Sequence, residues 1–496
     1  MTGGRGESGA PTRRGGDGPG AMRDRLPALA PALRAAAGRH GTPLYVTDGA
    51  ALDDAAEAVR AAFPDPWLRT YSLKANDLPA LVARIAARGF GANVVSRGEW
   101  SLARRAGLPN AAITLEGIGK TDGDLRAAVR AAAAGEPLRW VALESADEAA
   151  ALARIARGAG RDDLRIDALI RLNPAVEPET HAGLATGSRA SKFGVSPDEV
   201  GAVIEAGGGP GGPIHWRGLH LHVGSQLSAV DAWRDAVRRA LALLALLQGG
   251  LVDFDTLDVG GGMPVVPWRP GGLGRAAEAD ALDDLNPDRA PVPSGAPGPE
   301  LFAAELPSLL AAIPVDRRPR RLAVEPGRYL VAGSGWLVAR VLHVRERTLP
   351  PATAPMDRSG AHALAVLPPG STTDDRTRRL VVLDAGMTEL VRPALYGAEH
   401  AIVALTSLGR VPRPDATSTA RPARVDGPIC EATDTFGEHL LPPLRRGDLV
   451  AIADAGAYAA SMRSAYNGRP RPAEVIVEPD GALILARRRG TLGSLA

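Results

Sequence analysis

The stretch LRTYSLKANDLPALVARIAARG (68–89) decides the fold. It joins a β-prone run, Thr70–Leu73, to an amphipathic helical pattern at 78–89, and Lys74 stands where the first gives way to the second. The same order of a short strand and then a helix recurs along the chain to about residue 335. Such an alternation predicts a parallel sheet with helices packed on its outside.

Eight strand candidates lie within this alternating region. Helical patterns separate them, for example at 99–107, 122–135, 147–160 and 232–247. Eight strands separated by helices predict a (β/α)8 barrel, the TIM barrel of the α/β class, whose active site lies at the C-terminal ends of the strands. The candidates are LRTYSLKAN (68–76), GFGANVVS (89–96), AAITLEG (111–117), RWVALES (139–145), IDALIRLN (166–173), WRGLHLHVGS (216–225), TLDVGGG (256–262) and RLAVEPGRYL (321–330).

The pattern changes after about residue 335. Strand-like segments then follow one another without long helices, at 336–346, 378–386, 448–456 and 473–486. This predicts a separate, mainly-β C-terminal domain. We therefore expect a barrel over 49–335 and a β domain over 336–496.

Three further segments are expected to lack regular structure. Residues 1–25 form a disordered tail that is rich in Gly and Arg and contains Met22, an alternative start. The stretches 266–299 and 349–377 are rich in Pro, Gly and Asp, which indicates surface insertions.

Composition narrows the possible functions. The 496 residues are 45% hydrophobic and 23% charged, with a net charge of +2, which argues against nucleic acid as a partner. The most apolar run, 240–247, is too short to cross a membrane. The single cysteine, Cys430, excludes an internal disulfide and predicts a reducing, cytoplasmic location.

Lys74 is a candidate for covalent chemistry. Only three of the 58 basic residues are lysine, namely Lys74, Lys120 and Lys192. An arginine stays protonated, whereas a lysine can lose its proton and form a Schiff base with a carbonyl group. At the end of a barrel strand, Lys74 could hold pyridoxal 5'-phosphate. The alternative is a solvated residue at a strand end.

Two strand ends offer groups for a phosphate and a pyridine ring. The backbone of Gly260, Gly261 and Gly262 could approach phosphate oxygens closely, although such a run is also a common turn. His222 could stack on the ring, and Ser225 could bind the phosphate. His222 could also be a core histidine, or form a metal pair with His220. We set the metal aside, because no third ligand lies nearby in the sequence.

The eighth strand ends in Glu325-Pro326-Gly327-Arg328. A carboxylate at Glu325 could keep a pyridine nitrogen protonated and so make the ring a stronger electron sink. Gly327 and Arg328 could bind anionic groups. In isolation, the same four residues favour a turn that carries an exposed ion pair.

Together these motifs resemble the pyridoxal phosphate-dependent decarboxylases of the alanine racemase-like fold (fold type III), and most closely the diaminopimelate decarboxylases. The resemblance runs from residue 42 to residue 477. It is carried by TPLYVTD (42–48), YSLKAN (71–76), NVVSRGEW (93–100), SKFGV (191–195), HVGSQ (222–226), DVGGG (258–262), EPGRYLV (325–331), RPALYGAEH (392–400), GPICEATDTFG (427–437) and GAYAASMRSAYNGRPRPAEV (456–475).

The resemblance implies a role for each matching residue. Lys74 would form the Schiff base, His222 would stack on the ring, and Glu325 would meet the pyridine nitrogen. The phosphate would be lined by Ser225, Gly260, Gly261, Gly262, Gly327 and Arg328, with Asn93 near the cofactor and Tyr458 shared between cofactor and substrate. The substrate would be held by Arg328, Arg392, Tyr396 and Glu431.

The resemblance also implies an assembly and a reaction. Cys430 would come from the second subunit of a homodimer and act at the α-carbon, and the N-terminal strand within 40–48 would join the C-terminal β domain. The implied reaction converts meso-2,6-diaminopimelate into L-lysine and carbon dioxide, as a step of lysine biosynthesis.

Two departures from the family pattern and three alternatives accompany this reading. Asn93 stands where the family usually has an acidic residue, and Ala432-Thr433 replaces the usual Ser-Gly. The alternatives are decarboxylation of another amino acid, such as D- or L-ornithine, lysine, arginine or a carrier-tethered intermediate; racemisation, which Glu325 disfavours; and a non-catalytic relative that binds the cofactor.

Overall fold

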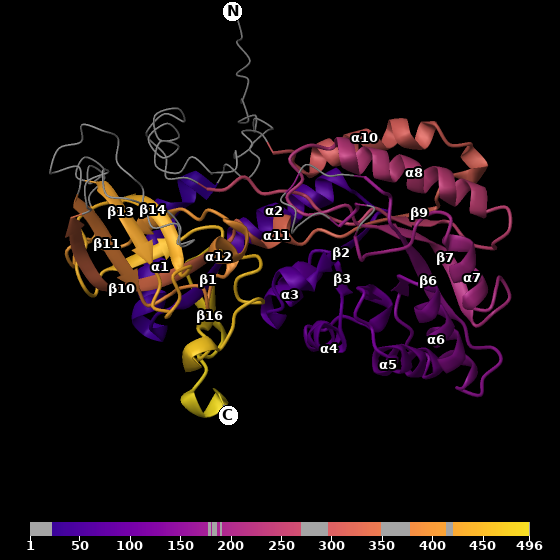
Figure 1. Ribbon diagram of the computed structural model, residues 1–496, viewed down its shortest axis with the longest axis horizontal. Coiled ribbons are helices and arrows are strands. Elements are labelled where there is room, and N and C mark those ends of the chain that lie inside the picture. Colours follow the sequence, from indigo (N-terminus) through magenta and orange to yellow (C-terminus); the bar gives the residue numbers. More distant parts are fainter. Residues whose placement is uncertain are drawn as a thin grey trace, which may run out of the picture.

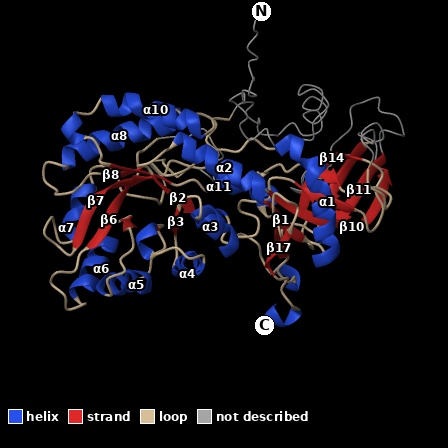
Figure 2. Cartoon of the chain, turned by 180° about the vertical axis from the view of Figure 1, so that it is seen from behind, coloured by secondary structure: helices blue, strands red, loops and turns tan. Residues whose placement is uncertain are grey.

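The computed structural model describes residues 22–176, 180, 186–188, 191–268, 296–348, 377–412 and 420–495. They form two units, a barrel surrounded by helices and a unit built mainly of strands (Figure 1). Seen from behind, helices enclose the barrel, whereas strands dominate the other unit (Figure 2). No helix of the described residues is long and apolar enough to cross a membrane.

The predicted eight-stranded barrel is confirmed. Its strands pair in chain order, all of them parallel, and β9 closes the ring on β2 through the pair Leu68 and Ala323. Their residues are buried almost throughout, as expected when a parallel sheet lies beneath helices. The strands are β2 (Leu68–Ser72), β3 (Gly91–Val94), β4 (Ile113–Leu115), β5 (Trp140–Leu143), β6 (Ile166–Leu172), β7 (Ile214–Leu221), β8 (Thr256–Asp258) and β9 (Arg321–Val324).

Helices follow the barrel strands as the sequence predicts, and hydroxyl side chains begin several of them. The side chains of Ser96 and Ser145 accept hydrogen bonds from the amides of Glu99 and Glu148, and Thr121 forms a capping box with Asp124. Each cap fixes where the chain turns after a strand. The helices are α2 (Gly49–Ala62), α3 (Pro79–Ala86), α4 (Arg97–Arg105), α5 (Asp122–Ala133), α6 (Ala146–Arg157), α7 (Val200–Ala206), α8 (Asp231–Leu247), α10 (Pro299–Ala311) and α11 (Arg328–Val331).

The second unit is a nine-stranded sheet, ordered β14-β13-β11-β10-β1-β16-β17, with β15 pairing with β10 and with β12. Its strand β1 lies antiparallel to β10 and parallel to β16, although it is distant from both in sequence. The elements are β1 (Leu44–Asp48), β10 (Gly335–Thr348), β11 (Thr377–Leu383), α12 (Arg392–Tyr396), β12 (Ile402–Ala404), β13 (Arg421–Asp426), β14 (Thr435–Leu441), β15 (Leu449–Ile452), β16 (Ala473–Val477) and β17 (Leu483–Arg487).

The structure departs from the sequence predictions at the N-terminus and in the sheet. Helix α1 (Met22–His40) includes residues 22–25 of the expected tail, because its apolar face, with Leu29 and Leu33, packs in the core beside β1 and β10. Strands β12, β13 and β14 were not predicted. They are short, or carry exposed and proline residues that hide the alternation of a strand.

Most of the two expected insertions lies outside the described residues. Of the first, 266–268 and 296–299 are described, and Trp268 is buried against Trp336 of β10, with ring centroids 5.5 Å apart. Residue 299 already begins α10. Of the second, only Thr377 is described, as the first residue of β11.

Two glycines allow the barrel and the sheet to meet closely. A Cβ atom on Gly456 would overlap the carbonyl oxygen of Val331, and one on Gly335 would overlap Gly456 itself. Gly335 begins β10, and Gly456 follows β15. The backbones of the two segments therefore touch where the chain leaves the barrel.

We expect Gly456→Ala to lower the free energy of unfolding by about 2 kcal/mol, because the added methyl group forces the two backbones apart. Thermal and urea denaturation would measure this loss. Gly201→Ala is the matched control, since a Cβ there meets nothing within 4 Å. Equal stability of the two variants would show that the junction is not closely packed.

Candidate active site

A ring of polar side chains lies at the C-terminal end of the barrel. Each of the eight strands contributes one residue, within its last residues or just after its end. Except for Lys74, all of them are buried. In strand order they are Lys74, Asn93, Glu116, Glu144, Arg171, His220, Asp258 and Glu325. Polar groups are buried at such a cost only where they pair with one another or serve a site.

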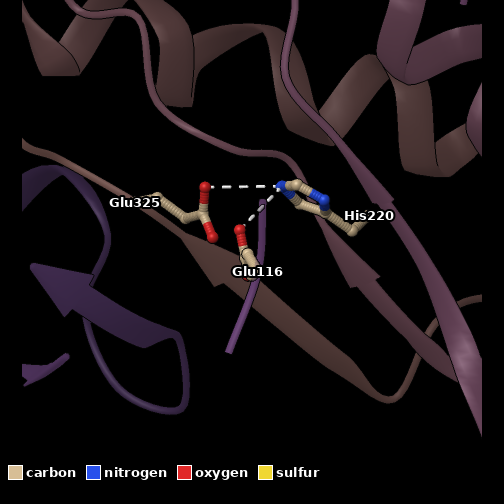
Figure 3. Close-up of side chains that lie close together, drawn as sticks. All are labelled: Glu116, His220 and Glu325. Atoms are coloured by element: carbon tan, nitrogen blue, oxygen red, sulfur yellow. Dashed lines mark ion pairs between the residues drawn. The ribbon is translucent and has the colours of Figure 1, made fainter. Parts of the chain in front are cut away.

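Glu325 is at the centre of the side-chain contacts within the ring. Nε2 of His220 lies 3.4 Å from a carboxylate oxygen of Glu325 and 3.4 Å from one of Glu116. Figure 3 shows these three side chains pointing toward one another from β4, β7 and β9. The side-chain amide of Asn93 donates a hydrogen bond to Glu325. Glu325 is therefore held from several strands at once.

Burial determines the protonation of this cluster. Burial and the nearby charge of Glu325 raise the pKa of Glu116 to about 8. The same two causes raise the pKa of Asp258 well above its usual range. Burial lowers the pKa of His220 to about 4, so this imidazole is neutral at pH 7. Glu116 therefore retains its proton at neutral pH, and Asp258 binds a proton more tightly than an exposed aspartic acid does.

A glycine loop follows β8. Gly260 and Gly262 have φ values of +68° and +104°, which favour glycine. A Cβ atom on Gly261 would overlap the carbonyl oxygen of Glu325. Asp258 accepts a hydrogen bond from the amide of Gly260 at 2.9 Å, which fixes the loop beside the ring. The loop is thus a backbone surface without side chains.

His222 and Ser225 extend from the end of β7 toward this loop. Nδ1 of His222 accepts a hydrogen bond from the amide of Gly261 at 3.3 Å. Burial, followed by the charge of Lys74, holds the pKa of His222 well below its usual value. Its imidazole is therefore neutral, which leaves its face suited to stacking.

Arg328 contacts both Ser225 and Tyr458. Its Nε and Nη2 each lie 3.2 Å from the Ser225 hydroxyl, to which they donate. Its guanidinium lies over the Tyr458 ring, 4.7 Å from the ring centroid. Arg328 is buried, with a relative exposure of 6%. Gly327 before it packs closely on Ser72, so that its Cβ would lie 3.1 Å from that side chain.

The second unit closes one side of the Lys74 turn. The amide of Tyr458 donates to the carbonyl of Ala75 at 2.8 Å, and the side chain of Asn76 donates to the carbonyl of Gly456 at 3.0 Å. Ser461 donates to the carbonyl of Lys74 at 3.0 Å. The Lys74 backbone is therefore fixed by the C-terminal unit as well as by the barrel.

Arg392 lies at the start of α12. Its Nη1 lies 3.2 Å from Nε2 of His400, whose Nδ1 donates to the carbonyl of Ala453 at 2.9 Å. Nε2 of His400 is therefore the acceptor for the guanidinium. Burial, followed by the charge of Arg328, lowers the pKa of Arg392 to about 10. Tyr396, at the other end of α12, acts electrostatically on Arg328 and Arg392 in the opposite direction and raises the pKa of each.

Neither arginine has a carboxylate partner within 4 Å among the described residues. Arg328 is bonded to a hydroxyl group, and Arg392 to a neutral imidazole. A buried guanidinium without a counter-ion is costly. Arg328 is buried and Arg392 is partly buried, and the charge of Arg328 acts on Arg392. Two guanidinium groups this close to one another favour the binding of an anionic group between or beside them.

Cys430 and Glu431 lie apart from this ring. They belong to the exposed loop between β13 and β14, and Cys430 is a free thiol. Asp434 organises the loop by accepting hydrogen bonds from the amides of Met387 at 2.6 Å and Ile429 at 2.7 Å. Glu431 accepts one from the Tyr466 hydroxyl at 2.8 Å. The structure does not bring this pair into hydrogen bonds with the other predicted site residues that it describes.

The other two lysines have structural contacts elsewhere. Lys120 is fully enclosed, lies 3.0 Å from the carboxylate of Glu148 and also donates to the carbonyl of Gly117. Lys192 lies over the Phe193 ring, with its Nζ 5.3 Å from the centroid. Of the three lysines, Lys74 is the one at the polar ring.

Sequence reasoning missed Glu116 and Asp258, and it gave His220 only a metal role. Glu116 directly follows β4, and Asp258 is the last residue of β8. An acidic residue at the end of an apolar strand was the feature of the sequence that could have identified both. The argument against a third ligand near His220 was wrong in space, because Glu116 and Glu325 come to it from other strands. The imidazole nitrogen and carboxylate oxygens of these three residues lie within 4.8 Å of one another.

Comparison with known proteins agrees with this geometry. Residues 50–279 match the family model of the pyridoxal-dependent decarboxylase, pyridoxal binding domain. The diaminopimelate decarboxylase of Deinococcus radiodurans is 34% identical over 92% of this chain and 96% of its own length, and that of Aquifex aeolicus is 31% identical over 92% and 91%. The chain belongs to the pyridoxal-dependent decarboxylases.

Solved structures of this family have the same architecture. Diaminopimelate decarboxylase from Helicobacter pylori, complexed with L-lysine, aligns with a TM-score of 0.72 and 27% identity. The alignment covers 92% of this chain and 96% of that one. The barrel and the sheet of this chain are thus those of a pyridoxal-dependent decarboxylase.

The residues present fit pyridoxal 5'-phosphate, the cofactor of this family. An exposed amine at Lys74 and a carboxyl group at Glu325 belong to the same ring of strand ends. Between β7, β8 and β9 lie a glycine loop, a neutral imidazole and the buried guanidinium of Arg328, which lacks a carboxylate partner among the described residues. Such a set is suited to an aldehyde, a pyridine ring and a dianionic phosphate.

We expect Gly261→Ala to weaken the binding of pyridoxal 5'-phosphate by about tenfold or more, because the methyl group displaces the loop from Glu325. Equilibrium dialysis of the apoprotein with the cofactor would measure the affinity. Gly119→Ala is the control, since a Cβ there meets nothing within 4 Å. An unchanged affinity in Gly261→Ala would show that the glycine loop does not contribute to cofactor binding.

Proposed function

We propose that this chain removes one carboxyl group from meso-2,6-diaminopimelate and releases L-lysine and carbon dioxide. The observation that carries the proposal is the pair of arginines, the buried Arg328 and the partly buried Arg392, neither of which has a carboxylate partner within 4 Å among the described residues. A substrate with a second, distal carboxylate supplies the missing anion. The names of the relatives, diaminopimelate decarboxylases, support the same substrate.

His400 makes Arg392 suitable for such a substrate. A carboxylate partner would neutralise the guanidinium, whereas the neutral Nε2 of His400 orients it and leaves its charge in place. Arginine can then grip a carboxylate through two parallel hydrogen bonds. Arg392 and Tyr396, at the two ends of α12, would hold the distal carboxylate, and Arg328 and Tyr458 would line the pocket between substrate and cofactor.

The remaining residues would bind and orient the cofactor. Lys74 would hold it through its amine until the substrate amine takes its place. His222 would stack on the ring, Glu325 would meet the ring nitrogen, and Asn93 would fix Glu325. The phosphate would be bound by Ser225, Gly260, Gly261, Gly262, Gly327 and Arg328.

The bound cofactor supplies an electron sink for the pair of electrons left when the bond from Cα to the carboxylate breaks. The side chains supply orientation and a proton. Cys430 would deliver that proton to Cα, and Glu431 would bind an amino group of the substrate. Both lie on the exposed loop of the second unit, so we place them in the site of the other subunit of a homodimer.

We also place the enzyme in the cytoplasm. Cys430 is the chain's only cysteine and is exposed as a free thiol. An exposed thiol that serves as a proton donor has to stay reduced, which the cytoplasm favours.

Carbon dioxide release from the cofactor-loaded protein tests the proposal. We expect release from meso-diaminopimelate and none from L- or D-lysine, L- or D-ornithine or L-arginine, which lack the second carboxylate. Lys74→Ala should abolish release, whereas Lys192→Ala should preserve it. Release from one of the monocarboxylic amino acids instead would show that this amino acid, and not meso-diaminopimelate, is the substrate. A fully active Lys74→Ala variant would overturn the mechanism.

The variant Arg392→Met tests, in the same assay, whether Arg392 binds the distal carboxylate. We expect its kcat/KM for meso-diaminopimelate to fall by a factor of about one hundred, equivalent to losing a charge-assisted pair worth about 3 kcal/mol. Cofactor affinity should stay unchanged. Arg410→Met, at an exposed position, is the control. If Arg392→Met kept its preference for the dicarboxylic substrate, Arg392 would not bind the distal carboxylate.

A further inference from the structure

Asp454 is a buried acid in the bend that follows β15. It is 5% exposed, and its φ of +55° lies in the left-handed region that residues other than glycine rarely adopt. One carboxylate oxygen accepts a hydrogen bond from the backbone amide of Trp268 at 2.6 Å. The other has no hydrogen-bond partner among the described residues. A buried carboxylate in a strained backbone conformation is costly, which indicates that it has a specific task.

The Trp268 amide belongs to the segment 263–268, which leads away from the glycine loop. The side chain of Gln226, beyond the end of β7, accepts a hydrogen bond from the amide of Val265 at 2.8 Å and donates one to its carbonyl at 3.3 Å. The Trp268 ring packs against Trp336 of β10. The segment is therefore fixed to the barrel at Val265 and to the sheet unit at Trp268.

The backbone just before Asp454 leads to Arg392. The carbonyl of Ala453 accepts the hydrogen bond from Nδ1 of His400 at 2.9 Å, and Nε2 of His400 lies 3.2 Å from Nη1 of Arg392. The peptide plane that carries this carbonyl turns with the φ angle of Asp454. The bend at Asp454 therefore determines how His400, and through it Arg392, is oriented.

The residues after Asp454 are fixed as well. The amide of Ala455 donates to the carbonyl of Gly335 at 2.9 Å, and the amide of Gly456 donates to the carbonyl of Ala332 at 3.2 Å. A change of conformation at Asp454 is therefore not relieved by movement of the residues that follow it. It is passed instead to Ala453 and the groups bonded to it.

We propose that Asp454 is a positioning residue for the substrate. By holding the Trp268 amide, its carboxylate keeps the bend in the conformation in which Ala453 orients His400 and His400 orients Arg392. Asp454 acts through these residues, so it affects the binding of the distal carboxylate and not the breaking of the bond at Cα. The inference rests on the proposed function, because the role of Arg392 does.

A purely structural role for Asp454 has a different signature. If the carboxylate only joined the two units, its loss would lower stability and would reduce cofactor affinity and kcat together. Gln226 holds Val265 between the glycine loop and Trp268, so loss of the Trp268 contact should leave the cofactor end in place. A change in KM without a change in kcat or cofactor affinity therefore separates the two roles.

Two substitutions separate the carboxylate from the backbone conformation. Asp454→Asn keeps an oxygen that can accept from the Trp268 amide, and asparagine tolerates the left-handed region. Asp454→Gly adopts this region without steric cost and removes the acceptor. Thr406→Val is the matched control, because it removes the side-chain acceptor of another backbone amide, that of Leu449 at 2.8 Å, at the start of β15.

Hydrogen exchange of the holoenzyme tests the hydrogen bond itself and uses no substrate. Mass spectrometry of the peptides that contain Trp268 would measure the exchange of its amide. We expect this exchange to be about tenfold faster in Asp454→Gly than in the wild type, and within about threefold of the wild type in Asp454→Asn and Thr406→Val.

Steady-state kinetics with meso-diaminopimelate gives the second readout. We expect the KM of Asp454→Gly to rise about tenfold, with kcat and the affinity for pyridoxal 5'-phosphate within about twofold of the wild type. Asp454→Asn should restore the wild-type KM, and Thr406→Val should leave it unchanged.

Three results would overturn the inference. The first is equal exchange at Trp268 in Asp454→Gly and the wild type. The second is a wild-type KM in Asp454→Gly, or a KM in Asp454→Asn as high as that of the glycine variant. The third is a joint fall of kcat and cofactor affinity in Asp454→Gly, which is the signature of a structural junction. If the exchange results are as expected and the wild type fails to decarboxylate meso-diaminopimelate, only the proposed function is contradicted.

Discussion

The closure of eight parallel strands into one ring is the constraint on which the site depends. It brings residues that are up to 251 positions apart, Lys74 and Glu325, to the same end of the barrel. Each strand end adds a polar group, and the helices outside exclude water from all but the open end. In such surroundings charges interact strongly and the burial of a charge is costly, so the protonation of each group in the ring depends on its neighbours.

The second unit completes this end of the barrel. Strand β1 anchors the N-terminal part of the chain in the C-terminal sheet, and Asp48 at its end caps α2, the first helix of the barrel. From the other direction, Tyr458 and Ser461 bind the backbone of the Lys74 turn. Arg392 therefore belongs to the sheet unit, and Arg328 belongs to the barrel. The charge of Arg328 acts on Arg392 because the two units are closely packed.

Much of this could be predicted from the sequence. The eight strands were predicted because each has a clear apolar run, and Lys74, His222, Gly260 to Gly262 and Glu325 were predicted because they follow such runs. Strands β12 to β14 and helix α1 were missed, since their burial depends on contacts distant in the sequence. Glu116 and Asp258 were missed for a related reason: an acid at the end of a strand shows its meaning only when barrel closure brings it to Glu325.

The central claim is that the cofactor lies at the C-terminal end of the barrel and is held there by Lys74. Reduction of the holoenzyme with borohydride, followed by proteolysis and mass spectrometry of the peptides, tests this claim most directly. The account predicts the pyridoxyl group on the peptide that contains Lys74, with none on Lys120 or Lys192. A modified Lys120 or Lys192 with an unmodified Lys74 would contradict it.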